Sequence, residues 1–238
     1  MTLTKPNGQR AKMAIALIGG VLAAEVLAFY SSYLQYTLLE DAASGIFSEE
    51  AMAANDAREQ LVAGIYFLLF AGSGLAFVLW FRRAYYNLQQ RTGANSFSDG
   101  WALGSWFVPI LCLYRPYQIM RELYLDTSRM LAAFGQEYAL KTTYLGSWWA
   151  LWIFSNFLGQ ILFRSYMNSE TLEGLTNATV ASMFGNLVGI PLALITMKVI
   201  KDYARVEKLL WETEQGEGDG MAASGEAGLS GNAFLPVN

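Results

Sequence analysis

The stretch WALGSWFVPILCLYRPYQIMREL, residues 101–123, decides how the chain meets a membrane. It begins like a membrane span and ends like a soluble helix, and Pro109 and Pro116 interrupt it. Its apolar part, residues 101–114, would be about 21 Å long as a helix, too short for a bilayer core of about 30 Å. Proline also removes a helical hydrogen bond, so the broken backbone needs protein or water around it. We therefore expect residues 101–116 to form a re-entrant or interfacial segment that does not cross.

The composition around this stretch is typical of a polytopic membrane protein. Hydrophobic residues make up 54% of the 238 residues and charged residues only 15%, whereas soluble domains carry about 25% charged residues. The chain has no histidine, and Cys112 is its single cysteine. The commonest metal ligand and the usual general base are thus missing. We expect a protein that is not an enzyme, with no catalytic, cofactor or metal site and no nucleic-acid partner.

Four stretches have the length and apolar character of membrane-spanning helices. An all-α, four-helix transmembrane bundle is therefore the expected fold, with a membrane domain over residues 1–211. The Gly-rich, acidic residues 212–238 are expected to be a disordered tail. The four expected spans cover residues 13–39, 60–81, 143–163 and 179–200.

The distribution of Lys and Arg favours four spans over five. Cytoplasmic loops collect these residues. If residues 101–116 do not cross and the N-terminus is inside, 14 cations lie inside and only Arg58 and Arg164 lie outside. If the stretch crosses, the count becomes 7 inside and 9 outside. We therefore expect a multi-pass protein of the cell (inner) membrane with both termini in the cytoplasm. The 14 cations are Lys5, Arg10, Lys12, Arg82, Arg83, Arg91, Arg115, Arg121, Arg129, Lys141, Lys198, Lys201, Arg205 and Lys208.

Residues 117–134 have the pattern of an amphipathic helix. At 100° per residue the apolar side chains form one stripe, and Arg121, Glu122, Asp126 and Arg129 fall on the opposite side. Such a helix is suited to lying in the membrane interface. The alternative is that the stripe packs on another cytoplasmic helix. The stripe consists of Ile119, Met120, Leu123, Tyr124, Thr127, Met130, Leu131 and Phe134.

Residues 81–128, followed by GSWWALWIFSNFLG, resemble a bacterial membrane family known as domain of unknown function four-three-two-eight. The resemblance covers roughly residues 60–200 and implies a four-helix membrane protein with no assigned activity. Cys112 departs from it, because a small polar residue is expected there. The features that carry the resemblance are Arg83, Asn87, Trp101, Trp106–Pro109, Arg115–Gln118, Arg121–Glu122 and Trp148–Trp149.

Glu25 lies near the middle of the first expected span, where a carboxylate is costly and marks a candidate site. It would be protonated or paired, and Asn156, Gln160 and Asn186 are expected at a similar depth. A hydrogen-bonded glutamic acid that stabilises the bundle is one interpretation. A proton or cation relay is another, and contact with solvent or lipid headgroups is a third.

Two functional hypotheses follow. In the first, the protein is not an enzyme and associates with lipids or a partner at the cytoplasmic face. Trp101, Trp106, Arg115, Arg121 and Arg129 would contact membrane lipids, including anionic ones, a partner protein or a second copy. In the second, the protein is a small transporter or channel that uses Glu25 as a proton- or ion-coupled site.

Overall fold

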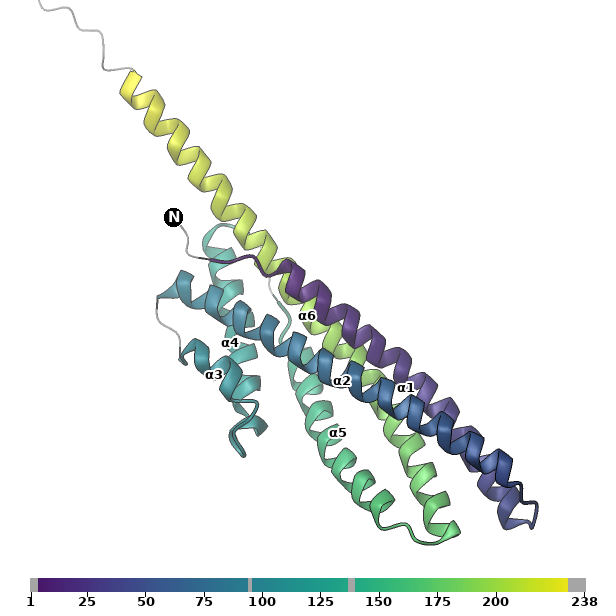
Figure 1. Cartoon of the computed structure of the whole chain (residues 1–238). Coiled ribbons are helices and arrows are strands. Elements are labelled where there is room, and N and C mark those ends of the chain that lie inside the picture. Colours follow the sequence, from purple (N-terminus) through teal and green to yellow (C-terminus); the bar gives the residue numbers. More distant parts are fainter. Residues whose placement is uncertain (1–3, 94–95, 137–139, 231–238) are drawn as a thin grey trace, which may run out of the picture.

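Four long helices lie side by side over most of their length in the computed structural model of this protein (Figure 1). They are α1 (Gly8–Ala43), α2 (Glu49–Thr92), α5 (Thr143–Met167) and α6 (Leu172–Ser230). The structure describes residues 4–93, 96–136 and 140–230, with side chains up to residue 216. Within these ranges every regular element is helical, as the sequence predicts.

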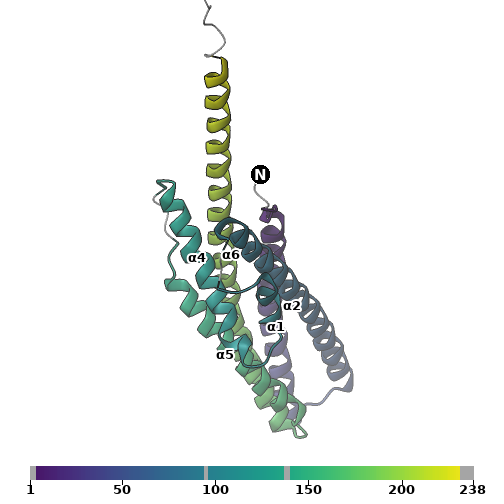
Figure 2. The ribbon, with the colours of Figure 1, turned by 90° about the vertical axis from the view of Figure 1, so that its left-hand side faces the viewer.

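The helices are arranged as a curved layer in the order α2, α1, α6, α5. Helix α1 packs extensively on both α2 and α6, and α5 packs chiefly on α6. Short connections, residues 44–48 and 168–171, join α1 to α2 and α5 to α6 at one end of the molecule (Figures 1 and 2). The N-terminus and the shorter elements lie at the opposite end, which we call the N-terminal end.

Local sequence signals explain where α2 begins and ends. The Ser48 hydroxyl accepts a hydrogen bond from the Ala51 amide at 3.3 Å, and Glu49 and Glu50 occupy the first turn. Both features favour a helix N-terminus. At the other end Gly93 adopts a φ of 69° and its amide bonds to the Gln89 carbonyl oxygen, which is a glycine C-cap.

Three described helices are long and apolar enough to cross a membrane, namely α1, α2 and α6. The first, second and fourth expected spans lie inside these helices, which also extend beyond the predicted boundaries. Helix α5 contains the third expected span and is long enough, but its hydropathy does not meet the same standard. Its polar residues Asn156 and Gln160 and its tryptophans lower the hydropathy of the helix.

The segment around residues 101–114 is a broken chain of short elements. Helix α3 (Asp99–Gly104) is followed by turns and by the 3₁₀ turn η1 (Leu111–Leu113). Ile110 has φ 69° and ψ −48°, and the Leu111 amide bonds to the Pro109 carbonyl oxygen at 2.8 Å. This is a γ-turn with positive φ, a rare and strained conformation for a β-branched residue. Phe107, Val108, Pro109 and Ile110 are all exposed at this turn.

Helix α4 (Arg115–Ala133) begins with Pro116 in its first turn, two residues earlier than expected. Of its apolar stripe, Ile119, Met120, Leu123 and Leu131 are fully buried. The stripe packs against α6 and α2, which is the alternative of packing on another helix. The Tyr124 hydroxyl donates to the Val199 carbonyl oxygen of α6 at 2.9 Å, which fixes this packing.

The last part of α6 differs from the expected disorder. The helix continues without a break to Ser230. Arg91 of α2 forms two hydrogen bonds with the Glu214 carboxylate, at 2.8 and 3.1 Å, and this pair is mostly buried. The packed part of the chain therefore extends past the expected boundary at residue 211, because the ion pair between Arg91 of α2 and Glu214 holds the next turn of α6. Residues 231–238 of the expected tail lie outside the described residues.

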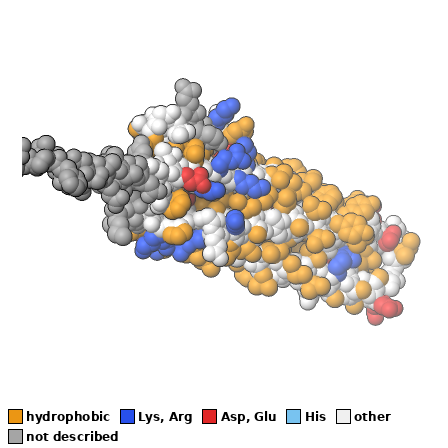
Figure 3. Space-filling model, turned by 90° about the horizontal axis from the view of Figure 1, so that it is seen from above, with side chains coloured by type: hydrophobic (Ala, Val, Ile, Leu, Met, Phe, Trp, Pro, Cys, Tyr) orange, Lys and Arg blue, Asp and Glu red, His pale blue; other side chains and the backbone are white. Residues whose placement is uncertain are grey.

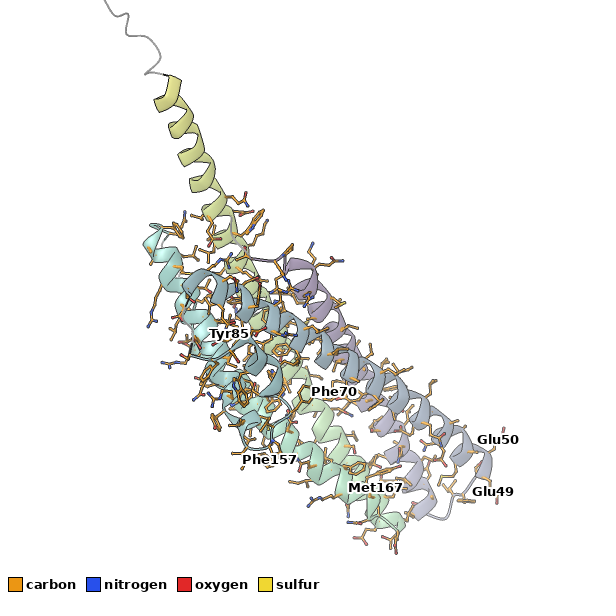
Figure 4. All side chains as sticks on the ribbon, turned by 60° about the vertical axis from the view of Figure 1, so that its left-hand side comes forward. Glu49, Glu50, Phe70, Tyr85, Phe157 and Met167 are labelled. Carbon is orange, nitrogen blue, oxygen red and sulfur yellow. The ribbon has the colours of Figure 1, made fainter. Side chains whose placement is uncertain are left out.

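Charge is segregated along the molecule. On the face shown in Figure 3, blue side chains gather toward the N-terminal end, and orange apolar side chains cover the middle. In Figure 4, Glu49 and Glu50 lie at the opposite end of α2 from Tyr85. The arrangement is that expected of a protein with a lipid-covered middle.

Candidate functional site: a groove between helices α2 and α5

A cavity of about 770 Å³ lies between α2 and α5, with α1 and α6 behind it. Helices α2 and α5 approach each other near Phe77 and Trp148, whose ring centroids are 6.1 Å apart. Figure 1 shows the two helices diverging from there toward the connections at the opposite end. The cavity is therefore a lateral groove, open along the side of the bundle. Its volume lies within the usual range for sites that bind small molecules.

Glu25 of α1 forms the floor of this groove and is 5% exposed. The Tyr66 hydroxyl of α2 donates to Glu25 Oε1 at 2.8 Å. The orientation of the Asn186 side-chain amide on α6 follows from the groups around it. In that orientation Asn186 Nδ2 donates to Glu25 Oε2 at 3.1 Å. In the same orientation the Asn186 oxygen accepts from the Phe29 amide at 3.2 Å. The carboxylate thus joins three helices through two hydrogen bonds.

Gly189 of α6 makes room for the carboxylate. A Cβ atom at this position would lie 2.1 Å from Glu25 Oε1 and 2.4 Å from its Cδ. Any side chain here would push Glu25 away from Tyr66 and Asn186. The small-residue pattern of Gly185 and Gly189 therefore has a second role besides close helix packing.

Helix α5 supplies a polar strip on the opposite wall. Asn156 and Gln160 are exposed and line the groove. The Asn156 amide donates to the Trp152 carbonyl oxygen at 2.8 Å. Within the described part of the chain, the buried hydroxyl of Ser155 has no hydrogen-bond partner. All four residues of the predicted polar site, Glu25, Asn156, Gln160 and Asn186, thus line one cavity.

Aromatic side chains close the groove near the N-terminal end of the molecule. The Trp106 ring packs edge-on against Phe77 and Phe81 of α2, with centroids 5.4 and 5.8 Å away. It also packs against Trp149 and Trp152 of α5, at 6.1 and 5.5 Å. The Trp106 indole therefore joins α2 and α5 as an internal anchor.

A smaller cavity of about 190 Å³ continues from the groove toward the connections at the other end. The two cavities share Tyr66, Ser182 and Asn186. Its other polar lining residues include Gln35, whose amide donates to Thr179 Oγ1 at 3.2 Å, and Glu59. Polar side chains therefore lead from Glu25 to the end of the bundle.

The three arginines predicted to contact lipids differ from one another in their surroundings. The Arg115 guanidinium lies over the Phe97 ring at 4.3 Å and near the Trp101 ring at 5.8 Å. Arg121 is exposed, and Arg129 is exposed but pairs with Asp126 at 2.7 Å. Arg115 and Trp101 thus stabilise the junction between α3 and α4 through a cation–π contact, and Arg121 is the one most available to a phosphate.

Comparison with known protein families identifies the family of the chain. The model of the family described as "Domain of unknown function (DUF4328)" matches residues 44–205, which is more than half of the sequence. The chain belongs to the DUF4328 family. This confirms the resemblance found in the sequence. No curated protein matches it, and no solved structure matches it either.

The DUF4328 features noted in the sequence meet at the N-terminal end of the bundle. Asn87 is buried and bonds to Glu207 Oε1 and to the backbone of Lys5, at 2.7 and 2.9 Å. Glu122 accepts from the Tyr85 hydroxyl and the Ser96 amide, both at 2.9 Å. Trp149 Nε1 donates to the Leu113 carbonyl oxygen at 2.8 Å. In this DUF4328 protein these residues join the broken segment 101–114 and α4 to the bundle.

Several residues of the site were not predicted from the sequence. Tyr66, Trp152 and Ser155 line the groove, but neither their types nor their spacing distinguishes them from ordinary span residues. The signal that could have found Tyr66 is its hydroxyl within an apolar run at the depth of Glu25. Among the described residues, no group of three or more Asp, Glu or Cys side chains is placed to hold a metal ion.

Proposed function

We propose that this protein is a four-span membrane protein, not an enzyme, that binds an amphiphilic molecule from the bilayer in the groove between α2 and α5. The observation that supports this most directly is the lateral opening of a 770 Å³ cavity lined by apolar walls and a few polar groups. Such a composition is typical of ligand sites. Because the opening lies between two expected spans, a ligand dissolved in the lipid reaches it without entering water.

The proposed topology makes α5 the fourth span. It runs alongside α6 and has 25 residues, enough to cross a bilayer core. The connections 44–48 and 168–171 lie at the same end, which we assign to the outer side of the cell membrane. The Lys and Arg residues then concentrate on the cytoplasmic side, together with both termini.

Residues 101–114 are proposed to dip into the cytoplasmic leaflet. Trp106 contacts Trp152, which lies well inside α5, and Trp149 bonds to the Leu113 backbone. These contacts hold the segment against the bundle. Phe107 and Ile110 are 74% and 73% exposed, as expected for side chains that insert among lipid tails. Membrane lipids are thus proposed partners, and Arg121 is placed to meet anionic headgroups.

The topology makes a direct prediction for labelling. Single cysteines at Lys12 and Lys141, placed in a Cys112→Ser background, should react with a membrane-impermeant thiol reagent from the same side of the cell membrane. The reason is that four spans and a dip return the chain to the cytoplasm. A cysteine at Arg164 should react from the other side. Reaction of the Lys12 and Lys141 positions from opposite sides would overturn the proposed topology.

Filling the groove should prevent amphiphile binding. Gly74 and Gly159 line the groove, and a Cβ atom at either position meets nothing within 4 Å. Gly74→Leu and Gly159→Leu therefore add a side chain at the lining of the groove, and its Cβ atom meets no neighbour. Photocrosslinking with a diazirine-bearing fatty alcohol, mapped by mass spectrometry, is expected to fall to less than about half at the groove residues.

Matched controls exist on the same two helices. Gly64 and Gly146 also have open space at Cβ but do not line the groove. Gly64→Leu and Gly146→Leu bring the same gain in helix propensity, so they should leave crosslinking at the groove unchanged. Equal crosslinking around the whole lipid-facing surface, unaffected by the groove-filling variants, would show that the groove is not a binding site.

A second candidate function is coupled transport, and the smaller cavity supports it. This cavity shares Tyr66 and Asn186 with the groove and extends to Glu59 near the proposed outer side. A ligand or ion at Glu25 would then have a polar route in one direction. If the protein is a transporter, liposomes containing it should show a flux that Glu25→Gln abolishes. If the protein binds a ligand but shows no flux, the transport function is wrong and only the binding function stands.

A further inference from the structure

We infer that the groove selects amphiphilic cations, such as hydrophobic amines or quaternary ammonium and phosphonium ions, which pair with Glu25. This inference rests on the proposed binding function and names the chemistry of the ligand. It is drawn from the carboxylate at the floor of the groove, the aromatic walls around it and the apolar remainder of the cavity.

The carboxylate of Glu25 has the surroundings of an anion that needs a counter-ion. Both of its oxygens accept hydrogen bonds, from Tyr66 at 2.8 Å and from Asn186 at 3.1 Å. Among the described residues, no Lys or Arg lies within ion-pair distance of it. A buried carboxylate is costly unless a positive charge accompanies it. A cationic ligand would supply that charge when it enters the groove.

The walls are suited to a cation with a bulky apolar body. The Tyr66 ring stacks on Phe70, with centroids 6.1 Å apart, next to the carboxylate. Phe77, Trp148 and Trp152 line the same cavity toward its closed end. Aromatic faces attract cations, most strongly where water is excluded. A carboxylate within such walls therefore favours a hydrophobic cation over a neutral or anionic molecule of the same size.

The inference can be tested with two ions of nearly equal size and shape, tetraphenylphosphonium and tetraphenylborate. Binding to the full chain in a nonionic detergent is followed by the tryptophan fluorescence of the groove. We expect the cation to bind at least about tenfold more tightly than the anion. Glu25→Gln, which keeps the size of the side chain, should weaken binding of the cation by at least about tenfold and change that of the anion little.

A second variant separates the charge from the shape of the floor. Gly189→Ala leaves the carboxylate in the chain but displaces it from Tyr66 and Asn186, because its Cβ would overlap Glu25. Cation binding should weaken in this variant also. Wild-type affinity for the cation in folded Glu25→Gln protein would overturn the inference. If the fatty alcohol still crosslinks in the groove in that case, the proposed binding function stands and only the ligand class is wrong; if it does not, both are wrong.

Discussion

Replacing Trp106 by alanine is expected to lower the free energy of unfolding by about 3–5 kcal/mol, the usual cost of truncating a packed tryptophan. The ring contacts Phe77 and Phe81 of α2 and Trp149 and Trp152 of α5. Its loss leaves a hole between two helices that otherwise diverge. Chemical unfolding in mild detergent measures the free-energy difference, and hydrogen exchange over residues 101–114 should rise because this segment loses its anchor.

The neighbouring residue provides the control for this prediction. Phe107 is 74% exposed and packs outside the aromatic cluster. Phe107→Ala in detergent should therefore change stability by no more than about 0.5 kcal/mol, as is usual for surface positions. If Trp106→Ala and Phe107→Ala have equal effects, the aromatic cluster does not hold residues 101–114 to the bundle.

Replacing Glu207 by alanine is expected to cost about 2–4 kcal/mol, because two buried amide donors lose their acceptor. Asn87 Nδ2 donates to Glu207 Oε1 at 2.7 Å, and Asn7 Nδ2 donates to Oε2 at 3.0 Å. The three side chains are all at most 8% exposed and come from α2, from α6 and from the residue before α1. Chemical unfolding should show the loss as a lower midpoint of unfolding.

The Glu207→Gln variant tests the charge at the same position. Burial raises the pKa of the Glu207 carboxyl above its ordinary value of 4.5, against the opposing effect of hydrogen bonds from Asn87 and Asn7. The stability contributed by this group is therefore greatest below pH 4.5 and falls as the pH rises through the raised pKa. Glutamine keeps the shape without the charge, so the variant should be at least as stable as the wild type at neutral pH.

The surroundings of Asn7 allow this substitution. Its side-chain oxygen is buried and, within the described residues, has no hydrogen-bond partner. When the amide turns, it accepts a hydrogen bond from the new glutamine and gives up only its long hydrogen bond, 3.5 Å, to the Trp80 carbonyl oxygen. Unfolding from about pH 5 to about pH 8 should show a weaker pH dependence in Glu207→Gln than in the wild type. An unchanged pH dependence would show that Glu207 ionises freely in the folded protein.

Much of the fold could be predicted because the length and hydropathy of each expected span depend only on neighbouring residues. Glu25, Asn156, Gln160 and Asn186 line one cavity, since residues at one depth of neighbouring spans have few alternatives. The orientation of α4 could not be predicted in the same way. An apolar stripe such as that of Leu123 and Leu131 is equally suited to lipid and to another helix. The part of α6 beyond its expected span provides the surface on which this stripe packs, and that decides in favour of another helix.

The sequence by itself determined the helical class, the positions of the apolar helices and the proline-broken segment 101–116, because helix length, hydropathy and proline chemistry act over neighbouring residues. Only the tertiary structure decided that α2 and α5 diverge and that Trp106 closes one end of the groove between them. It also placed Tyr66 and Gly189 against Glu25. These features depend on contacts between residues distant in the chain, and a single sequence carries no local signal for them.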